Sequence, residues 1–170
     1  MSRWAKATPG EGSPSEVTVD RYDLGPGYSI SRLIHGGWQF SAGHRLSQTA
    51  LDDALDVLEA SAELGVTTFD CADIYTGVEV LIGKFLRKYK DAFTAGDLTP
   101  VQIHTKYVPD YDALATLTKA DTAAIIDRSL RRLGVERLDL VQFAWWDYSI
   151  PGYVETAGHL AELQKEGKIR

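Results

Sequence analysis

The sequence predicts an α/β fold with parallel strands, preceded by a small β-hairpin. Two observations support this class: short apolar runs alternate with longer segments of helical periodicity, and glycines follow several of the helical segments. Such alternation is typical of right-handed βαβ units, which place successive strands side by side in one parallel sheet. Four strand-helix units can be counted from Leu33 onward.

The N-terminal part is expected to contain a tail and the hairpin. Residues 1–16 are rich in Ser, Thr, Pro and Gly without an apolar period, which predicts a flexible tail before a single domain over residues 17–170. Val17–Val19 and Tyr28–Ile30 are short β-prone runs. They flank Gly25-Pro26-Gly27, a typical turn sequence, and together predict the hairpin.

The first two units follow directly. Leu33–Gly36 is the first predicted strand, and Thr67–Phe69 is the second. The helix between them is expected to end at Gly65. The second helix shows the i, i+3, i+4, i+7 pattern, and we expect residues 88–99 after it to form a loop. Its apolar positions are Val78, Leu81, Ile82 and Phe85.

The last two units are equally regular. Val101–His104 and Leu138–Phe143 are the third and fourth predicted strands. The sequence predicts Asp121 as the N-cap of the helix between them, which Gly134 would end. A fourth helix is expected over 153–166, and a fifth strand would start near residue 168.

Two architectures are compatible with these units. A small open α/β sheet could be complete at this length. A closed (β/α)₈ TIM-type barrel typically needs about 250 residues, so that only its first four units would be present. Periodicity alone does not decide between them.

Composition excludes several classes of function. With 24 acidic and 18 basic residues, the net charge of −6 provides no basic surface for nucleic acid or an anionic membrane. No stretch approaches the roughly 18 apolar residues that a membrane span needs. The single cysteine, Cys71, allows no intramolecular disulfide and fits a reducing, cytoplasmic compartment.

Three polar side chains are expected at the carboxyl ends of neighbouring strands, where catalytic groups gather in parallel α/β folds. Asp70 follows the second strand, Lys106 follows the third, and Tyr75 lies in the loop after Asp70. Tyrosine is a poor general acid at its reference pKa of about 10, but a nearby ammonium favours the phenolate. With Lys106 oriented by Asp70, Tyr75 could protonate a carbonyl oxygen during nicotinamide-dependent reduction.

These residues lie within recognisable motifs. Residues 69–83, with an Asp and a Tyr five apart and then a Glu and a Gly, resemble the signature of the aldo-keto reductase family. The resemblance extends over residues 30–170. It also includes Gly36–Phe40, His104–Lys106 and Arg131–Leu140.

The resemblance implies the barrel rather than the open sheet, with this chain as its N-terminal half. It implies that Asp70, Tyr75 and Lys106 belong to a catalytic tetrad whose histidine position is occupied here by Ala144. Losing that hydrogen-bond donor would cost about 1–3 kcal/mol, or about 10- to 100-fold in rate. It further implies NADPH as cofactor, held near Gly37, Trp38 and Asp70, and a small carbonyl compound as substrate. Most of the cofactor site in the family lies on strands five to eight.

Two functional hypotheses follow. The chain belongs either to an impaired NADPH-dependent reductase of aldehydes or ketones, or to a non-catalytic, truncated relative with a binding or regulatory role. A half barrel would leave two strand edges unpaired, which a homo-oligomer would cover.

Other residues have simpler interpretations. His104 is expected in the core, no ligand spacing supports a metal site, and Arg128, Arg131 and Arg132 are expected to form a solvated helix face. Trp145, Trp146 and Tyr148 line either a substrate pocket or a packed loop.

Overall fold

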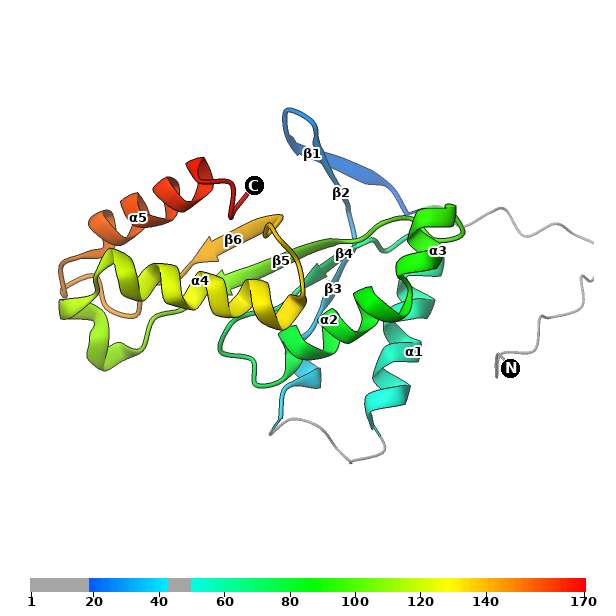
Figure 1. Ribbon diagram of the computed structural model, residues 1–170, viewed down its shortest axis with the longest axis horizontal. Coiled ribbons are helices and arrows are strands. Elements are labelled where there is room, and N and C mark those ends of the chain that lie inside the picture. Colours follow the sequence, from blue (N-terminus) through cyan, green and yellow to red (C-terminus); the bar gives the residue numbers. More distant parts are fainter. Residues whose placement is uncertain (1–18, 43–49) are drawn as a thin grey trace, which may run out of the picture.

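Four parallel strands form the central sheet of the computed structural model, which describes residues 19–42 and 50–170. The strand order is β3-β4-β5-β6, so each strand pairs with the next along the chain (Figure 1). The predicted α/β class and its parallel sheet are confirmed. The strands are β3 Ile34–Gly36, β4 Thr68–Asp70, β5 Gln102–Tyr107 and β6 Leu140–Phe143.

Helices cover one side of this sheet. Among them α2 packs against both α1 and α4, and α4 packs against α5, so the four lie in chain order beside the strands (Figure 1). Two 3₁₀ turns, η1 Trp38–Phe40 and η2 Tyr111–Thr116, follow the ends of β3 and β5. The helices are α1 Ala50–Glu63, α2 Val78–Lys88, α3 Lys90–Ala95, α4 Lys119–Leu133 and α5 Tyr153–Lys165.

The two faces of the sheet differ in burial. Phe69, Ile103 and Tyr107 alternate with polar positions along their strands and are at most 3% exposed, because they pack into the core beneath the helices. Ile34 points the other way and is 46% exposed. The strands therefore have one face in the helical core and a second face, here called the open face, on which the hairpin buries Thr68 and His104 while Ile34 stays exposed.

The predicted hairpin is present, but its first strand was misplaced. β1 spans Arg21–Gly25 and pairs antiparallel with β2, Tyr28–Ser31. The tight turn through Gly27, whose φ is +68°, brings Gly25 opposite Tyr28, so the pairing strand must directly precede the turn. Val19 instead lies beside Gly65, and the tail at 1–16 together with residues 17 and 18 lies outside the described residues.

The hairpin is fixed to the sheet by polar contacts. Ser31 Oγ accepts hydrogen bonds from the backbone N–H groups of Thr67 and Thr68, at 3.1 and 3.0 Å. Tyr28 Oη and His104 Nε2 share a hydrogen bond of 2.8 Å. Both contacts lie on the half of the sheet away from the carboxyl ends of the strands, which leaves those ends uncovered by the hairpin.

Two helix predictions need correction. Residues 88–99 are not a loop throughout, because Phe93 of α3 is partly buried and packs edge-on against Phe85, and this contact stabilises the short helix. Asp121 is not the N-cap of α4. Thr118 is the cap, and the Asp121 side chain accepts its backbone N–H at 2.9 Å, which forms a capping box. The expected fifth strand is represented by a single parallel bridge between Leu138 and Ile169.

Candidate active site

Strand register places three polar side chains at the carboxyl end of the sheet. Asp70 is the last residue of β4, and Lys106 of β5 is paired in register with Gln142 of β6. Residues two apart on a strand share a face, so these side chains extend from the open face and not into the helical core. β5 continues to Tyr107, one residue beyond Lys106.

Lys106 and Asp70 form an ion pair. Lys106 Nζ donates to Asp70 Oδ2 at 2.5 Å and to the carbonyl oxygen of Cys71 at 2.8 Å. Their side chains are 21% and 26% exposed, so the pair is accessible from solvent but largely enclosed by protein. An ammonium held at two points in this way has a defined position.

Tyr75 lies next to this pair. Lys106 Nζ is 5.3 Å from the centroid of the Tyr75 ring, a cation–π distance. The Tyr75 N–H donates to Ala72 O, and Val78 N–H donates to Tyr75 O, which folds the loop between β4 and α2 back over the strand ends. The structure thus brings together Asp70, Tyr75 and Lys106, three of the four predicted tetrad positions.

A buried carboxylate holds the loop that carries Tyr75. Asp73 is 4% exposed, and its oxygens accept from Val108 N–H at 3.1 Å and Arg128 Nη2 at 3.2 Å. Burial raises the pKa of Asp73 to about 6, although the hydrogen bond from Val108 opposes the increase. The Tyr75 loop is therefore connected to both β5 and α4.

A second buried acid continues this connection. Glu79 of α2 is 1% exposed, accepts from Thr105 Oγ1 at 2.8 Å, and pairs with Arg132 Nη1 at 3.1 Å. Arg132 also donates to the carbonyl oxygen of Asp73. We call Asp73, Glu79, Arg128 and Arg132 the acid–arginine cluster.

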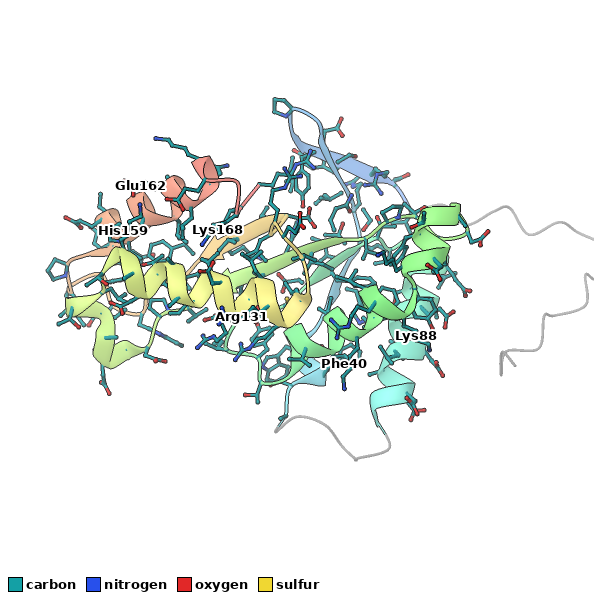
Figure 2. The ribbon with its side chains drawn as sticks, in the orientation of Figure 1. Phe40, Lys88, Arg131, His159, Glu162 and Lys168 are labelled. Atoms are coloured by element: carbon teal, nitrogen blue, oxygen red, sulfur yellow. The ribbon has the colours of Figure 1, made fainter. Side chains whose placement is uncertain are left out.

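The prediction of a solvated face on α4 was incomplete for Arg128 and Arg132: their side chains are 42% and 35% exposed, but their guanidinium groups pair with two buried acids. Arg131, the third residue of that predicted face, is exposed (Figure 2). The four-residue spacing of Arg128 and Arg132 was the available signal, since it places both on one side of the helix.

Gly37 lies where two backbones approach closely. Its N–H donates to Asp70 O at 2.7 Å, and a Cβ there would lie 2.8 Å from Val78 Cγ1. A larger residue would therefore push β3 away from β4. The neighbouring Gly36 has open space around the position of a Cβ, and Trp38 is 49% exposed.

Ala144 follows β6, at the same edge of the sheet. Its N–H donates to Tyr107 O at 3.0 Å, so its backbone continues the pairing with β5. The aromatic residues after it divide into two groups. Trp145 is 6% exposed and packs against Phe143, whereas Trp146 and Tyr148 are 57% and 68% exposed. The packed-loop interpretation fits Trp145 best, although Trp146 Nε1 donates to Pro109 O at 2.7 Å and the Tyr148 ring packs edge-on against Tyr153.

His104 and Cys71, the remaining candidate residues, are both buried in the protein. His104 is buried against Tyr28, and burial lowers its pKa. Burial also raises the pKa of the Cys71 thiol to about 12, which disfavours the thiolate that a nucleophile requires. Within residues 19–42 and 50–170, no group of three metal-ligating side chains comes together.

Gln142 was missed by the sequence reasoning, which treated it as an ordinary residue of the fourth strand. Its Nε2 donates to Asp70 Oδ1 at 2.8 Å. Gln142 is the single polar residue in β6, and that was the signal available.

Comparison with known proteins identifies the family. The sequence profile of the Aldo/keto reductase family matches residues 32–170. This chain belongs to the aldo/keto reductase family. The aldo-keto reductase dtxS3 of Metarhizium robertsii is 29% identical over 184 residues, which cover 93% of this chain and 49% of that protein.

Further aldo-keto reductases show the same partial match. Aldo-keto reductase YhdN of Bacillus subtilis is 30% identical over 85% of this chain and 43% of its own length. A crystal structure of the silkworm (Bombyx mori) aldo-keto reductase AKR2E5 complexed with NADPH superposes with a TM-score of 0.70 at 26% identity, covering 90% of this chain and 46% of that one. The chain thus spans about half the length of its relatives. In the described residues no helix has the length and apolar character to cross a membrane.

Proposed function

We propose that this chain forms the N-terminal half of a (β/α)₈ barrel that reduces a small aldehyde or ketone to an alcohol with NADPH. The supporting observation is the placement of Lys106 between the Asp70 carboxylate, 2.5 Å away, and the Tyr75 ring, 5.3 Å away. The match over residues 32–170 and the cofactor named in the silkworm relative's structure support the same activity.

The residues present fit the nicotinamide end of this cofactor. Gly36 leaves open space beside Asp70, with which it is paired in register, and the Trp38 side chain, two residues further along the chain, is 49% exposed. Gly37, Trp38 and Asp70 would hold that end. When bound, NADPH supplies the hydride that reaches the carbonyl carbon. The rest of the cofactor would be held by residues outside these four strand-helix units.

The protein's own contribution is proton transfer and orientation. Tyr75 donates its phenolic proton to the carbonyl oxygen, which completes the alcohol. The Lys106 ammonium stabilises the phenolate left on Tyr75, and Asp70 keeps that ammonium in place. Water then returns a proton to the phenolate.

Ala144 favours the alternative that the protein is a non-catalytic relative with a binding or regulatory role. The position offers no side-chain donor to a carbonyl oxygen, and loss of one such donor corresponds to about 10- to 100-fold in rate. Because the ion pair and Tyr75 remain assembled, we favour a slow enzyme over this alternative.

Titration with NADPH of the purified full-length protein, in which the second half of the barrel completes the cofactor site, tests the proposal when it is followed by quenching of tryptophan fluorescence. Trp38 lies at the proposed cofactor position, so saturable quenching in the micromolar range is expected, and the variant Trp38→Phe should lose most of the signal while still binding. Absence of binding up to millimolar NADPH, in protein with native circular dichroism, would contradict the reductase and favour the non-catalytic relative.

A further inference from the structure

We propose that Gln142 is a positioning residue, which holds the Asp70 carboxylate so that Asp70 in turn orients Lys106. Gln142 Nε2 donates to Asp70 Oδ1 at 2.8 Å, while Lys106 Nζ donates to Asp70 Oδ2 at 2.5 Å. The effect of Gln142 on catalysis rests on the proposed function, whereas its effect on the position of Asp70 and Lys106 does not.

Strand order makes this arrangement possible. Asp70 lies on β4 and Gln142 on β6, with Lys106 on β5 between them and paired in register with Gln142. The amide and the ammonium therefore approach the same carboxylate from two strands. A carboxylate with one donor on each oxygen is hindered from rotating about its terminal bond, so the lone pair directed at Lys106 stays in place.

The chemistry of the amide suits this task. A second cation at residue 142 would compete with Lys106 for Asp70, and a carboxylate would repel Asp70. A neutral N–H donor does neither. Gln142 is exposed and is the single polar residue of β6, so its side chain is not held in place by burial. The hydrogen bond to Asp70 fixes its conformation instead, at the cost of rotamer freedom.

The test uses the full-length protein with Gln142→Met and Gln142→Glu. Gln142→Met keeps the length but removes the donor, and should lower kcat/KM for a carbonyl substrate about 10-fold with little change in NADPH affinity. Gln142→Glu should be slower still at pH 8 and recover as the pH falls towards about 5, because the protonated carboxyl can again donate to Asp70. A purely structural loss would not recover in acid.

Matched controls are the same substitutions at Gln164, an exposed glutamine of α5 that donates to Arg170 O. They should leave both the rate and its pH profile unchanged. An equal fall in kcat/KM in the Gln164 variants would overturn the specific role of Gln142.

A second readout does not depend on turnover. Acetic anhydride labelling of lysines, followed by mass spectrometry without cofactor, reports how firmly Lys106 is held, with exposed Lys119 as internal reference. In the Gln142→Met variant, acetic anhydride should label Lys106 several times faster than in the parent protein. Unchanged labelling in both Gln142 variants overturns the proposal. Faster labelling in a protein that reduces no carbonyl compound supports the positioning role and refutes the proposed reductase instead.

Discussion

At the scale of single residues, Ala144 separates this chain from a complete tetrad. Its backbone is fixed to β5, and it lies two residues after Gln142, so its side chain projects from the same face of β6. We expect Ala144→His to raise kcat about 10- to 100-fold, because it supplies a donor to the carbonyl oxygen. Steady-state reduction assays measure this, with Ala144→Leu as the control. Equal rates for the His and Leu variants would contradict the assignment.

Asp73 gives a prediction about pH. Burial raises its pKa in the folded protein from 3.8 to about 6, so between these values the folded state binds more protons than the unfolded state. Stability from this residue is therefore present below about pH 4 and is lost as the pH rises towards 6. Asp73→Asn should flatten the pH dependence of the free energy of unfolding in this range. Urea titrations at several pH values test this, and a variant with the parent's slope would refute it.

At the scale of elements, the acid–arginine cluster connects α2, α4 and the loop of Tyr75. Arg132→Met would leave Glu79, which is 1% exposed, without its cationic partner. We expect a loss of about 3 kcal/mol in the free energy of unfolding. Arg131→Met is the matched control, since Arg131 is exposed one position earlier on α4. Chemical denaturation of both variants measures the difference, and equal losses would show that Glu79 does not depend on Arg132.

Element boundaries show what local sequence could predict. Strands β3 to β6 were located within a few residues, because each lies in a short β-prone run between two segments of helical periodicity. The first hairpin strand and α3 were not, because strand pairing with Tyr28–Ser31 and packing of Phe93 on Phe85 decide them. These contacts depend on neighbours that a local pattern does not contain.

The same distinction holds in the candidate site. Asp70 and Lys106 were placed at one edge from a general property of parallel sheets, and the structure joins them at 2.5 Å. Gln142 required the register between β5 and β6 as well, and Arg128 and Arg132 required the packing of α4 on α2. Sequence periodicity does not predict which side chains meet when they come from several different strands or helices.

At the scale of the whole molecule, these four units leave two strand edges unpaired and apolar side chains exposed on the open face of the sheet. Within the described residues β3 and β6 are the edge strands, and Ile34 is 46% exposed on the face away from the helices. A closed barrel would cover both edges and that face. Periodicity could not distinguish this barrel from an open sheet, and the family match over half the length of the relatives favours the barrel.

We therefore expect the 170-residue chain, expressed alone, to self-associate. Unpaired N–H and C=O groups on edge strands pair readily with another chain, and exposed apolar side chains on the open face add to the driving force. Size-exclusion chromatography with light scattering should show a dimer or larger species. Adding lysine to the edge, as in Ile34→Lys, should shift the population towards monomer, whereas Val154→Lys on α5, 67% exposed, should not. A monodisperse monomer of the parent chain would show that the four units can bury enough surface without a second half.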